Sequence, residues 1–434
     1  MAVLNRVILP ASLFALFLAS PAYAQNNSVS TVKVAAARPQ LAITKSRAKL
    51  PVGKIKVTQN AAYETQGAPA PTGKSKDNGW SFEPHGRLML DGGFIDAPAS
   101  TGVDDGFAHE VRRARLGAAG DIPGGFGYKV ELGFVNKIGE VFDADLSYTT
   151  GPVEIIVGQH NSFQSLEELT SSLHTSFIER AAFTDAFDLR RKLGVSATYS
   201  KDALLIQGGF FTDNIEDTAD DNRGVDIRAV YMPKTGATQW HIGGSFHYND
   251  LGQPDATVRY RQRPLVHFTE KRFLDTRRIA AQSETSLGVE TAVVRGRFHA
   301  AAEGYWQFVD VTSTANDPGF FGGSVEAGVF LTKDSRTYKK GKFDRVKPNA
   351  PLGKGGIGSV QFHVRYDHLD LNDAGILGGK QAGYFASLIW KPTAYTLLLV
   401  NYGRLHYTDA AIPAADGDSN YDVDVLGVRA QVDF

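Results

Sequence analysis

Strict alternation of apolar and polar residues is the feature that most constrains this chain, and it is clearest at the C-terminal end. One face holds Leu426, Val428, Ala430, Val432 and Phe434, and the other holds Gly427, Arg429, Gln431 and Asp433. A period of two places successive side chains on opposite sides of an extended strand. The segment is therefore expected to be a β-strand with one apolar and one charged face.

The same alternation recurs from Trp80 onward and defines sixteen candidate strands. They are 84–95, 108–119, 128–134, 143–148, 153–161, 191–199, 203–212, 224–232, 238–248, 285–294, 297–310, 320–331, 357–368, 381–391, 394–406 and 422–434. An even number of such segments is typical of a transmembrane barrel, with an apolar lipid face and a polar lumen. A soluble sandwich could show the same alternation, but its polar face would meet water on the outside. We therefore expect an all-β fold, a transmembrane antiparallel β-barrel of about 16 strands over residues 80–434.

The connections favour closure into a barrel, because short turns alternate with loops of variable length. Short turns are expected near 122–125, 150–152, 201–202, 233–236 and 295–296, and these should be periplasmic. Closure leaves no unpaired sheet edge in the membrane. Aromatic residues near strand ends, such as Trp240 and Trp390, could form interfacial girdles or pack in a core.

The first 79 residues differ from the rest of the chain. Residues 1–24 have the pattern of a signal peptide: Arg6, an apolar run, and the cleavage motif Ala22-Tyr-Ala24. Residues 25–79 are basic, lack periodicity and end in a Pro-rich stretch, which predicts a disordered periplasmic extension. This extension could be a solvated linker or could bind an anionic periplasmic partner. The chain contains no cysteine, so the fold cannot depend on disulfides.

Enzyme motifs are present only as near misses. Residues 67–75 resemble a phosphate-binding loop but have one residue too many and two prolines. The glycines of 353–358 match a dinucleotide-binding pattern, but they precede a candidate strand instead of following one. The chain has neither a G-x-S-x-G nor an H-E-x-x-H motif. We therefore expect neither an enzyme nor a cofactor, and no nucleic-acid partner.

Arginines on one candidate strand indicate where the lumen lies. In the sequence Glu110-Val-Arg112-Arg113-Ala-Arg115, Arg113 and Arg115 share one strand face. Arginine on the lipid face would cost about 2–4 kcal/mol at the bilayer midplane, so this face should line the lumen. Cross-strand pairing with the acidic residues Glu131, Asp143 and Asp145 is the alternative role, and pairing and function can coexist.

Two long basic segments could form a cationic constriction. In 249–284, Arg259, Arg261 and Arg263 alternate as a strand would place them on one side. In 332–356, Lys339, Lys340 and Lys342 belong to a long connection that strand counting places at the periplasmic end. Turns are usually short at that end, so the length predicts that the segment folds inward. A cationic constriction in a low-dielectric channel concentrates anions.

Several of these segments together resemble the phosphate-selective porin O and P family. They are the strand Glu110-Val-Arg-Arg-Ala-Arg-Leu-Gly117, Val157-Gly-Gln159, Leu166-Glu-Glu-Leu-Thr-Ser-Ser172 with Glu179-Arg180, and Val325-Glu-Ala-Gly-Val-Phe-Leu-Thr332 continuing to Lys347-Pro348. The terminal Phe434 is similar to the outer-membrane assembly signal. The resemblance spans about residues 80–434.

This resemblance implies a homotrimeric outer-membrane porin of a Gram-negative bacterium that passes phosphate or polyphosphate. Arg112, Arg113 and Arg115 match the arginine-bearing strand of the family, and the lysines of 332–356 match its inward-folded turn. Residues 162–190 match the pore loop and contain Arg180 and Arg190 but no lysine. The expected pore-lining set is thus Arg112, Arg113, Arg115, Arg180, Arg259, Arg261, Arg263, Lys339, Lys340 and Lys342.

Other functions stay open from the sequence. A general or weakly selective porin for small solutes is the nearest alternative. An outer-membrane barrel enzyme, such as a lipase, would need a positioned Ser/His pair that the sequence does not identify. An adhesion barrel would have a lumen filled by side chains. The expected partners are inorganic anions, such as phosphate, and outer-membrane lipids.

Overall fold

The structure is a computed structural model that describes residues 79–434 except 105, 218–220 and 314–315. The predicted signal peptide, 1–24, and all but the last residue of the predicted extension, 25–79, lie outside the described residues. In the described part, no helix is long and apolar enough to cross a membrane.

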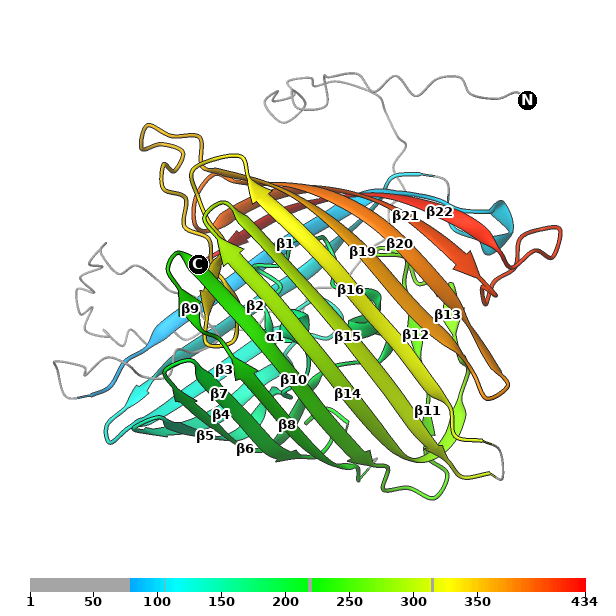
Figure 1. Ribbon diagram of the computed structural model, residues 1–434, viewed down its shortest axis with the longest axis horizontal. Helices are drawn as coiled ribbons and strands as arrows, with labels where there is room; N and C mark the ends of the chain where they lie inside the picture. The colour runs from blue at the N-terminus through cyan, green and yellow to red at the C-terminus, as the bar shows by residue number, and fades with distance from the viewer. Residues whose placement is uncertain (1–78, 105, 218–220, 314–315) are drawn as a thin grey trace, which may run out of the picture. The chain divides into compact units, whose positions relative to one another are not determined.

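Sixteen antiparallel strands form the wall of the barrel (Figure 1). They are β1 (Glu83–Asp96), β2 (Ala108–Ile122), β3 (Phe126–Gly133), β4 (Glu140–Thr150), β5 (Val153–Asn161), β6 (Arg191–Lys201), β7 (Leu204–Phe211), β8 (Arg223–Tyr231), β10 (Thr238–Asp250), β14 (Ile279–Arg295), β15 (Phe298–Val311), β16 (Gly319–Phe330), β19 (Ser359–Asp373), β20 (Ile376–Lys391), β21 (Thr396–Thr408) and β22 (Tyr421–Asp433). Two short strands, β9 (Lys234–Thr235) and β11 (Thr257–Val258), extend the same sheet. The last strand pairs with the first from Arg87↔Asp433 to Asp96↔Asp424, so the sheet is closed. The predicted all-β transmembrane barrel of about 16 strands is confirmed.

The burial pattern of the wall is the reverse of that of a soluble sheet. On β19, the buried residues Gln361, Arg365 and Asp367 alternate with the exposed residues Val364 and Tyr366. Apolar side chains on the outside can contact lipid, while the polar side chains turn into the lumen. This arrangement explains why the alternation in the sequence recurs from strand to strand of the wall.

The connections at the two ends of the barrel differ in length. At one end lie the short turns 123–125, 151–152, 202–203, 232–237, 296–297 and 392–395, together with the long segment 331–358. The other end has the two-residue turn 374–375 but also the largest loops, 162–190 and 251–278. Strand counting therefore placed 331–358 correctly among the short turns.

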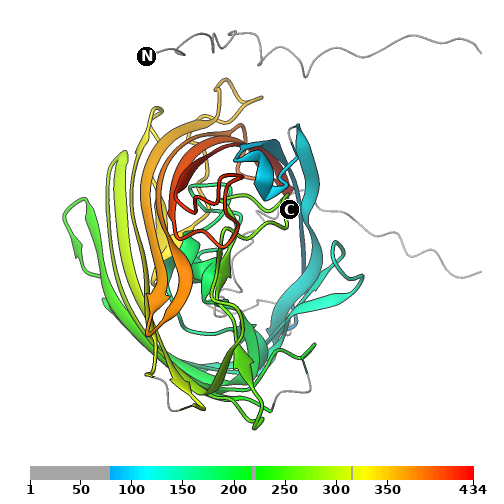
Figure 2. The same ribbon diagram turned by 90° about the vertical axis from the view of Figure 1, so that its right-hand side faces the viewer.

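Three of the long connections fold into the barrel (Figure 2). Segment 162–190 contains α1 (Leu166–Leu169) and α2 (Ala182–Ala186), and segment 251–278 contains β11, β12 (Arg261–Gln262) and β13 (Leu274–Asp275). Segment 331–358 contains a hairpin of β17 (Thr337–Lys339) and β18 (Lys342–Asp344).

An apolar core forms between these segments and the inner wall. Phe177 and Phe183 of segment 162–190 pack with Tyr305, Phe385 and Leu405, which are inward-facing residues of β15, β20 and β21. Each of these side chains is almost completely buried. The lumen is thus filled on the side of β14 to β22, and the remaining space lies against β1 to β6.

Candidate functional site

A wide cavity of about 1140 Å³ lies on this unfilled side of the lumen. Eleven arginines line it: Arg112, Arg113, Arg115, Arg180, Arg190, Arg191, Arg259, Arg261, Arg263, Arg272 and Arg278. Eight carboxylates also line it: Glu140, Glu168, Glu179, Asp185, Asp188, Glu216, Asp217 and Asp255. Guanidinium groups are therefore in excess, although many of them have an acidic neighbour.

A second, much smaller cavity of about 80 Å³, called the narrow cavity below, shares part of its wall with the first. Arg113, Arg115, Glu168, Arg180 and Arg191 line both cavities, so these residues surround the narrowing between them. The narrow cavity is lined by seven cationic side chains, Arg87, Arg113, Arg115, Lys129, Arg180, Arg191 and Lys342. Its carboxylates are Glu131, Glu168 and Asp344, so positive charge predominates around this cavity.

A β-bulge brings two consecutive arginines of β2 into the lumen. In the pairing of β1 with β2, Met89 opposes Arg113 and Leu90 opposes Val111, which leaves Arg112 without an opposite residue. A bulge of this kind interrupts the alternation of faces. Arg112 therefore lines the wide cavity with Arg113 and Arg115, although strict alternation would turn it toward lipid.

Arg112 connects the wall to segment 162–190. Its Nε and Nη2 donate to the two carboxylate oxygens of Glu179 at 2.6 and 3.1 Å. Arg429 of β22 also lies 3.4 Å from Glu179. Burial alone would raise the pKa of the Glu179 carboxyl, but Arg112 and Arg429 hold that pKa well below its usual range. This bidentate pair anchors the inward-folded segment at the cavity.

Arg115 has the cross-strand pairing expected as an alternative role. Its Nη1 lies 2.9 Å from Glu131 of β3, and its guanidinium stacks 3.3 Å over the Phe142 ring. Asp143 pairs instead with Lys129 and Arg191, each at 2.8 Å. The positive charge of Arg115 is thus largely compensated within the wall.

Arg113 differs from its neighbours in its contacts, although the carboxylates of Glu179 and Glu168 lie near enough to interact with its charge. Among the described residues, its guanidinium has no ion pair, and its buried Nε has no hydrogen-bond partner. Arg113 nevertheless lines both the wide and the narrow cavity. A buried charged donor without a protein partner is costly unless water or a ligand supplies an acceptor.

Arg180 is held by the backbone of its own segment. Its guanidinium donates to the carbonyl oxygens of Glu167, Glu168 and Thr170 at 2.9, 3.1 and 2.8 Å. Its Nη1 lies 3.2 Å from the Glu168 carboxylate. These contacts fix the turn between α1 and α2 and leave Arg180 at the narrowing with limited capacity for a further ligand.

The three alternating arginines of segment 251–278 all line the wide cavity, but they do not lie on one regular strand. The three arginines nevertheless lie on one side of the segment, as predicted, because they alternate with the buried residues Val258, Tyr260 and Gln262. Arg259 binds Asp275, and Arg263 lies 3.0 Å from Glu270. Arg261 is exposed and has no ion pair among the described residues.

The lysine-bearing hairpin lies inside the barrel, as its length predicted. The Tyr338 hydroxyl lies 2.5 Å from Nδ1 of His241, and Phe343 packs with Leu166 of α1. Lys342 lines the narrow cavity, whereas Lys339 and Lys340 line neither of the two cavities described above. Burial, together with the nearby Lys129, lowers the pKa of Lys342 to about 8.

Sequence reasoning missed three cationic residues of the narrowing, Arg87, Lys129 and Arg191. Arg87 and Lys129 occupy polar positions of alternating strands, so the alternation contained a signal for both. Arg191 begins β6 directly after an inward-folded segment, where alternation gives no information.

The model of the family described as phosphate-selective porin O and P matches residues 82–434. The chain belongs to this family. Its outer-membrane location in a Gram-negative bacterium and its function as a porin follow from this match and from the closed barrel. The family and the fold are those of a channel.

Individual proteins that resemble this porin include one relative and several solved structures. An uncharacterized protein of Caulobacter vibrioides is 46% identical over 368 residues, which cover 82% of this chain and 74% of the relative. An anion-selective porin of Comamonas acidovorans is 13% identical, with a TM-score of 0.53 over 82% of this chain and 100% of that chain. The channel DcaP of Acinetobacter baumannii is 14% identical, with a TM-score of 0.52 over 83% and 99% of the two chains. At these identities, the solved structures support the shared fold alone.

Proposed function

We propose that this porin is selective for anions and passes small oxyanions of the phosphate class through the narrowing between the two cavities. The observation that carries the proposal is the position of Arg113. It lines both cavities, and it has no acidic partner among the described residues. Its guanidinium can therefore offer hydrogen bonds to a passing anion without first breaking an ion pair.

The surroundings of Arg113 favour transient binding. Arg112, Arg115 and Arg180 are already paired or hydrogen-bonded, so they contribute positive potential more than free donors. An oxyanion would exchange part of its hydration shell for Arg113 and Lys342, which line the same narrow cavity. Conduction requires such binding to stay weak enough for release. The wide cavity, with its excess of arginines, would raise the local anion concentration in front of the narrowing.

A general porin with weak selectivity is the second candidate. It is favoured by the eight carboxylates that line the wide cavity beside the eleven arginines. If these charges cancel along the permeation path, cations would pass almost as well as anions.

The anion-selective porin of Comamonas acidovorans has a similar fold and supports the first candidate, the anion-selective porin, by analogy.

A salt-gradient measurement distinguishes these functions. The purified protein is inserted in planar bilayers, and the reversal potential is recorded in a KCl gradient and then with added inorganic phosphate. We expect the reversal potential to lie close to the equilibrium potential of chloride in this gradient. Added phosphate should reduce the current that chloride carries. A reversal potential near zero in the gradient would favour the general porin.

We also propose a homotrimer. One solved structure of similar fold is a trimer form of OmpT from Vibrio cholerae, with a TM-score of 0.53 and 12% identity. Chemical cross-linking of the porin in outer membranes tests this proposal. A ladder that ends at three copies is expected, and a band at one copy only would contradict it.

A further inference from the structure

Three potential metal ligands converge on the inner wall, outside the two arginine-lined cavities. They are His299 of β15, Glu326 of β16 and His363 of β19, and their ligand atoms all lie within 4.8 Å of one another. In the strand register, His299 opposes Gly328, and Gly328 in turn opposes His363. The two histidines thus flank one glycine in a single transverse row, and Glu326 lies two residues before that glycine on the same face.

Gly328 allows the two imidazoles to meet. A Cβ atom at this position would lie 2.4 Å from His299 and 2.6 Å from Nδ1 of His363, so any other residue would separate the rings. With glycine there, Nε2 of His299 lies 3.3 Å from Nδ1 of His363. Two ligands of a tetrahedral zinc ion, each about 2.0–2.1 Å from the metal, are separated by about 3.4 Å. The spacing of the nitrogens therefore already matches that of a metal pair.

The remaining ring nitrogens are compatible with this role. Nε2 of His363 lies 3.3 Å from Oε1 of Gln361, a contact that would place the proton on Nε2 and leave Nδ1 available as a ligand. Nδ1 of His299 is buried and has no hydrogen-bond partner among the described residues. The two facing nitrogens, Nε2 of His299 and Nδ1 of His363, are thus the atoms that would bind an ion, in place of the contact that they now make with each other.

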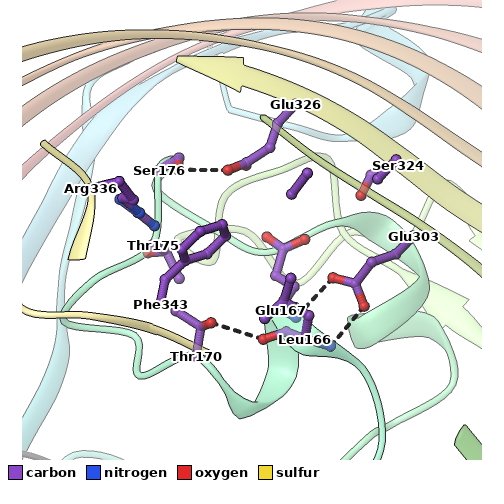
Figure 3. A pocket seen from close by; sticks show the side chains of 12 residues that line it. Leu166, Glu167, Thr170, Thr175, Ser176, Glu303, Ser324, Glu326, Arg336 and Phe343 are labelled. Atoms are coloured by element: carbon purple, nitrogen blue, oxygen red, sulfur yellow. Dashed lines mark hydrogen bonds between the residues drawn. The ribbon is translucent and has the colours of Figure 1, made fainter. Parts of the chain in front are cut away.

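Glu326 connects this row to a small cavity (Figure 3). The cavity has a volume of about 20 Å³, which suffices for about one water molecule. Three carboxylates line it, those of Glu167, Glu303 and Glu326, against one guanidinium, that of Arg336. Arg336 would repel a cation, and because Glu167 is already paired with Arg365 at 3.2 Å, Glu326 and Glu303 are the carboxylates that would offset it. Two histidines and one carboxylate, completed by a water molecule, are a common ligand set of zinc sites.

We propose that His299, Glu326 and His363 form a binding site for a divalent transition-metal ion of the zinc class. Two imidazoles and one carboxylate suit Zn²⁺, Co²⁺, Ni²⁺ or Cu²⁺ better than Ca²⁺ or Mg²⁺, which prefer oxygen ligands. The Ser176 hydroxyl now donates to Oε1 of Glu326 at 2.9 Å. A bound ion would therefore join β15, β16 and β19 to one another and, through Glu326, to segment 162–190.

Calorimetric titration with Zn²⁺ tests the site in the untagged full-length protein, purified in detergent and treated with chelator. The parent should bind one Zn²⁺ per chain, and His299→Phe and His363→Phe should each weaken this binding at least about tenfold, since even second-shell changes cost that much. Phenylalanine keeps a ring beside the aromatic neighbours Phe330 and Phe177. His406→Phe is the matched control, because His406 is exposed beside Asp422, away from the row, and should leave the affinity unchanged.

A parent that binds no Zn²⁺, or histidine variants that bind it with the affinity of the parent, would overturn the proposal. If either phenylalanine variant fails to fold, Glu326→Gln decides, because glutamine retains the shape and an oxygen for the Ser176 hydroxyl but not the charge. Unchanged Zn²⁺ affinity in a folded Glu326→Gln variant would likewise contradict the site. Co²⁺ bound in place of Zn²⁺ should show the optical spectrum of tetrahedral coordination in the parent and in His406→Phe alone.

Discussion

Nη2 of Arg228 donates a hydrogen bond of 2.8 Å to the carbonyl oxygen of Gly341, and this contact joins the barrel wall to the tip of the inward-folded hairpin. Arg228 also lies 2.7 Å from Glu290, and its Nη1 donates to Gln207 at 2.9 Å. The guanidinium is thus buried, and each of its three nitrogens donates a hydrogen bond. Lys342 follows the tip directly and is held at the narrow cavity by this attachment.

Replacement of Arg228 by Met should therefore destabilise the barrel. It would leave the buried Glu290 carboxylate without its main cation, a change that typically costs about 3–5 kcal/mol. The heat-modification temperature on gels, with unfolding in urea as a second measure, should fall clearly. Arg404→Met is the matched control, because Arg404 pairs with Asp422 and Asp424 on the outward face of β21, and its replacement leaves the buried contacts of Arg228 intact. Equal stability of the two variants would contradict the structural role of Arg228.

Anion selectivity should decrease as the pH rises from 7 to 9. Burial and Lys129 lower the pKa of Lys342 to about 8, so Lys342 is mainly charged at pH 7 and mainly neutral at pH 9. Reversal potentials recorded across this range should follow the titration. Lys342→Arg should remove the decrease, since arginine stays charged, and a parent whose selectivity is constant over this range would contradict the assignment.

Charge reversal at Lys342 should change ion selectivity more than charge reversal at Lys339. A reversal about 4 Å from an ion shifts its energy by twice a pair interaction of about 4 kcal/mol at an effective dielectric of 20. Even a tenth of that shift, about 0.8 kcal/mol, changes a permeability ratio about fourfold. Lys342→Glu should therefore lower the anion-to-cation ratio by about this factor or more, and Lys339→Glu should have a smaller effect. Equal effects would show that position on the narrow cavity does not matter.

The arginines of segment 251–278 should attract anions into the wide cavity and so increase the rate at which they enter. Alanine at Arg259, Arg261 and Arg263 together should reduce anion conductance more at low salt than at high salt, because the field is screened over about 10 Å at 0.1 M. Arg261→Ala alone should produce most of the effect, since Arg259 and Arg263 are already paired with acidic residues. Conductance measured from low to high KCl tests this, and an unchanged salt dependence would place the three outside the permeation path.

The wall of the barrel could be predicted because one physical rule acts at every position. Lipid outside and water inside impose the same alternation on all the strands, so each of the sixteen was found. Boundaries were less accurate where a bulge interrupts the rule. Strand β14 begins at Ile279 instead of 285, because the register shifts between Ala281 and Ser283 and breaks the alternation.

The lumen could be predicted only in part, because its contents depend on contacts between distant segments. That 331–358 folds inward followed from its length, but only the packing of Tyr338 and Phe343 distinguishes Lys342 from Lys339. Likewise, Arg112, Arg113 and Arg115 look equivalent in the sequence. Glu179, 67 residues from Arg112, and Glu131, 16 residues from Arg115, neutralise two of them and leave Arg113.

Single-channel reversal potentials of Arg113→Gln in a KCl gradient test the central claim most directly. Glutamine keeps hydrogen-bonding groups but removes the one arginine of its strand that has no acidic partner among the described residues. Arg404→Gln serves as the control, since it removes an arginine from the exposed surface. We expect the parent and Arg404→Gln to be equally selective for anions, and Arg113→Gln to have a markedly lower anion-to-cation permeability ratio. An Arg113→Gln porin that folds, conducts and keeps the ratio of the parent would contradict the claim that this arginine selects the anion.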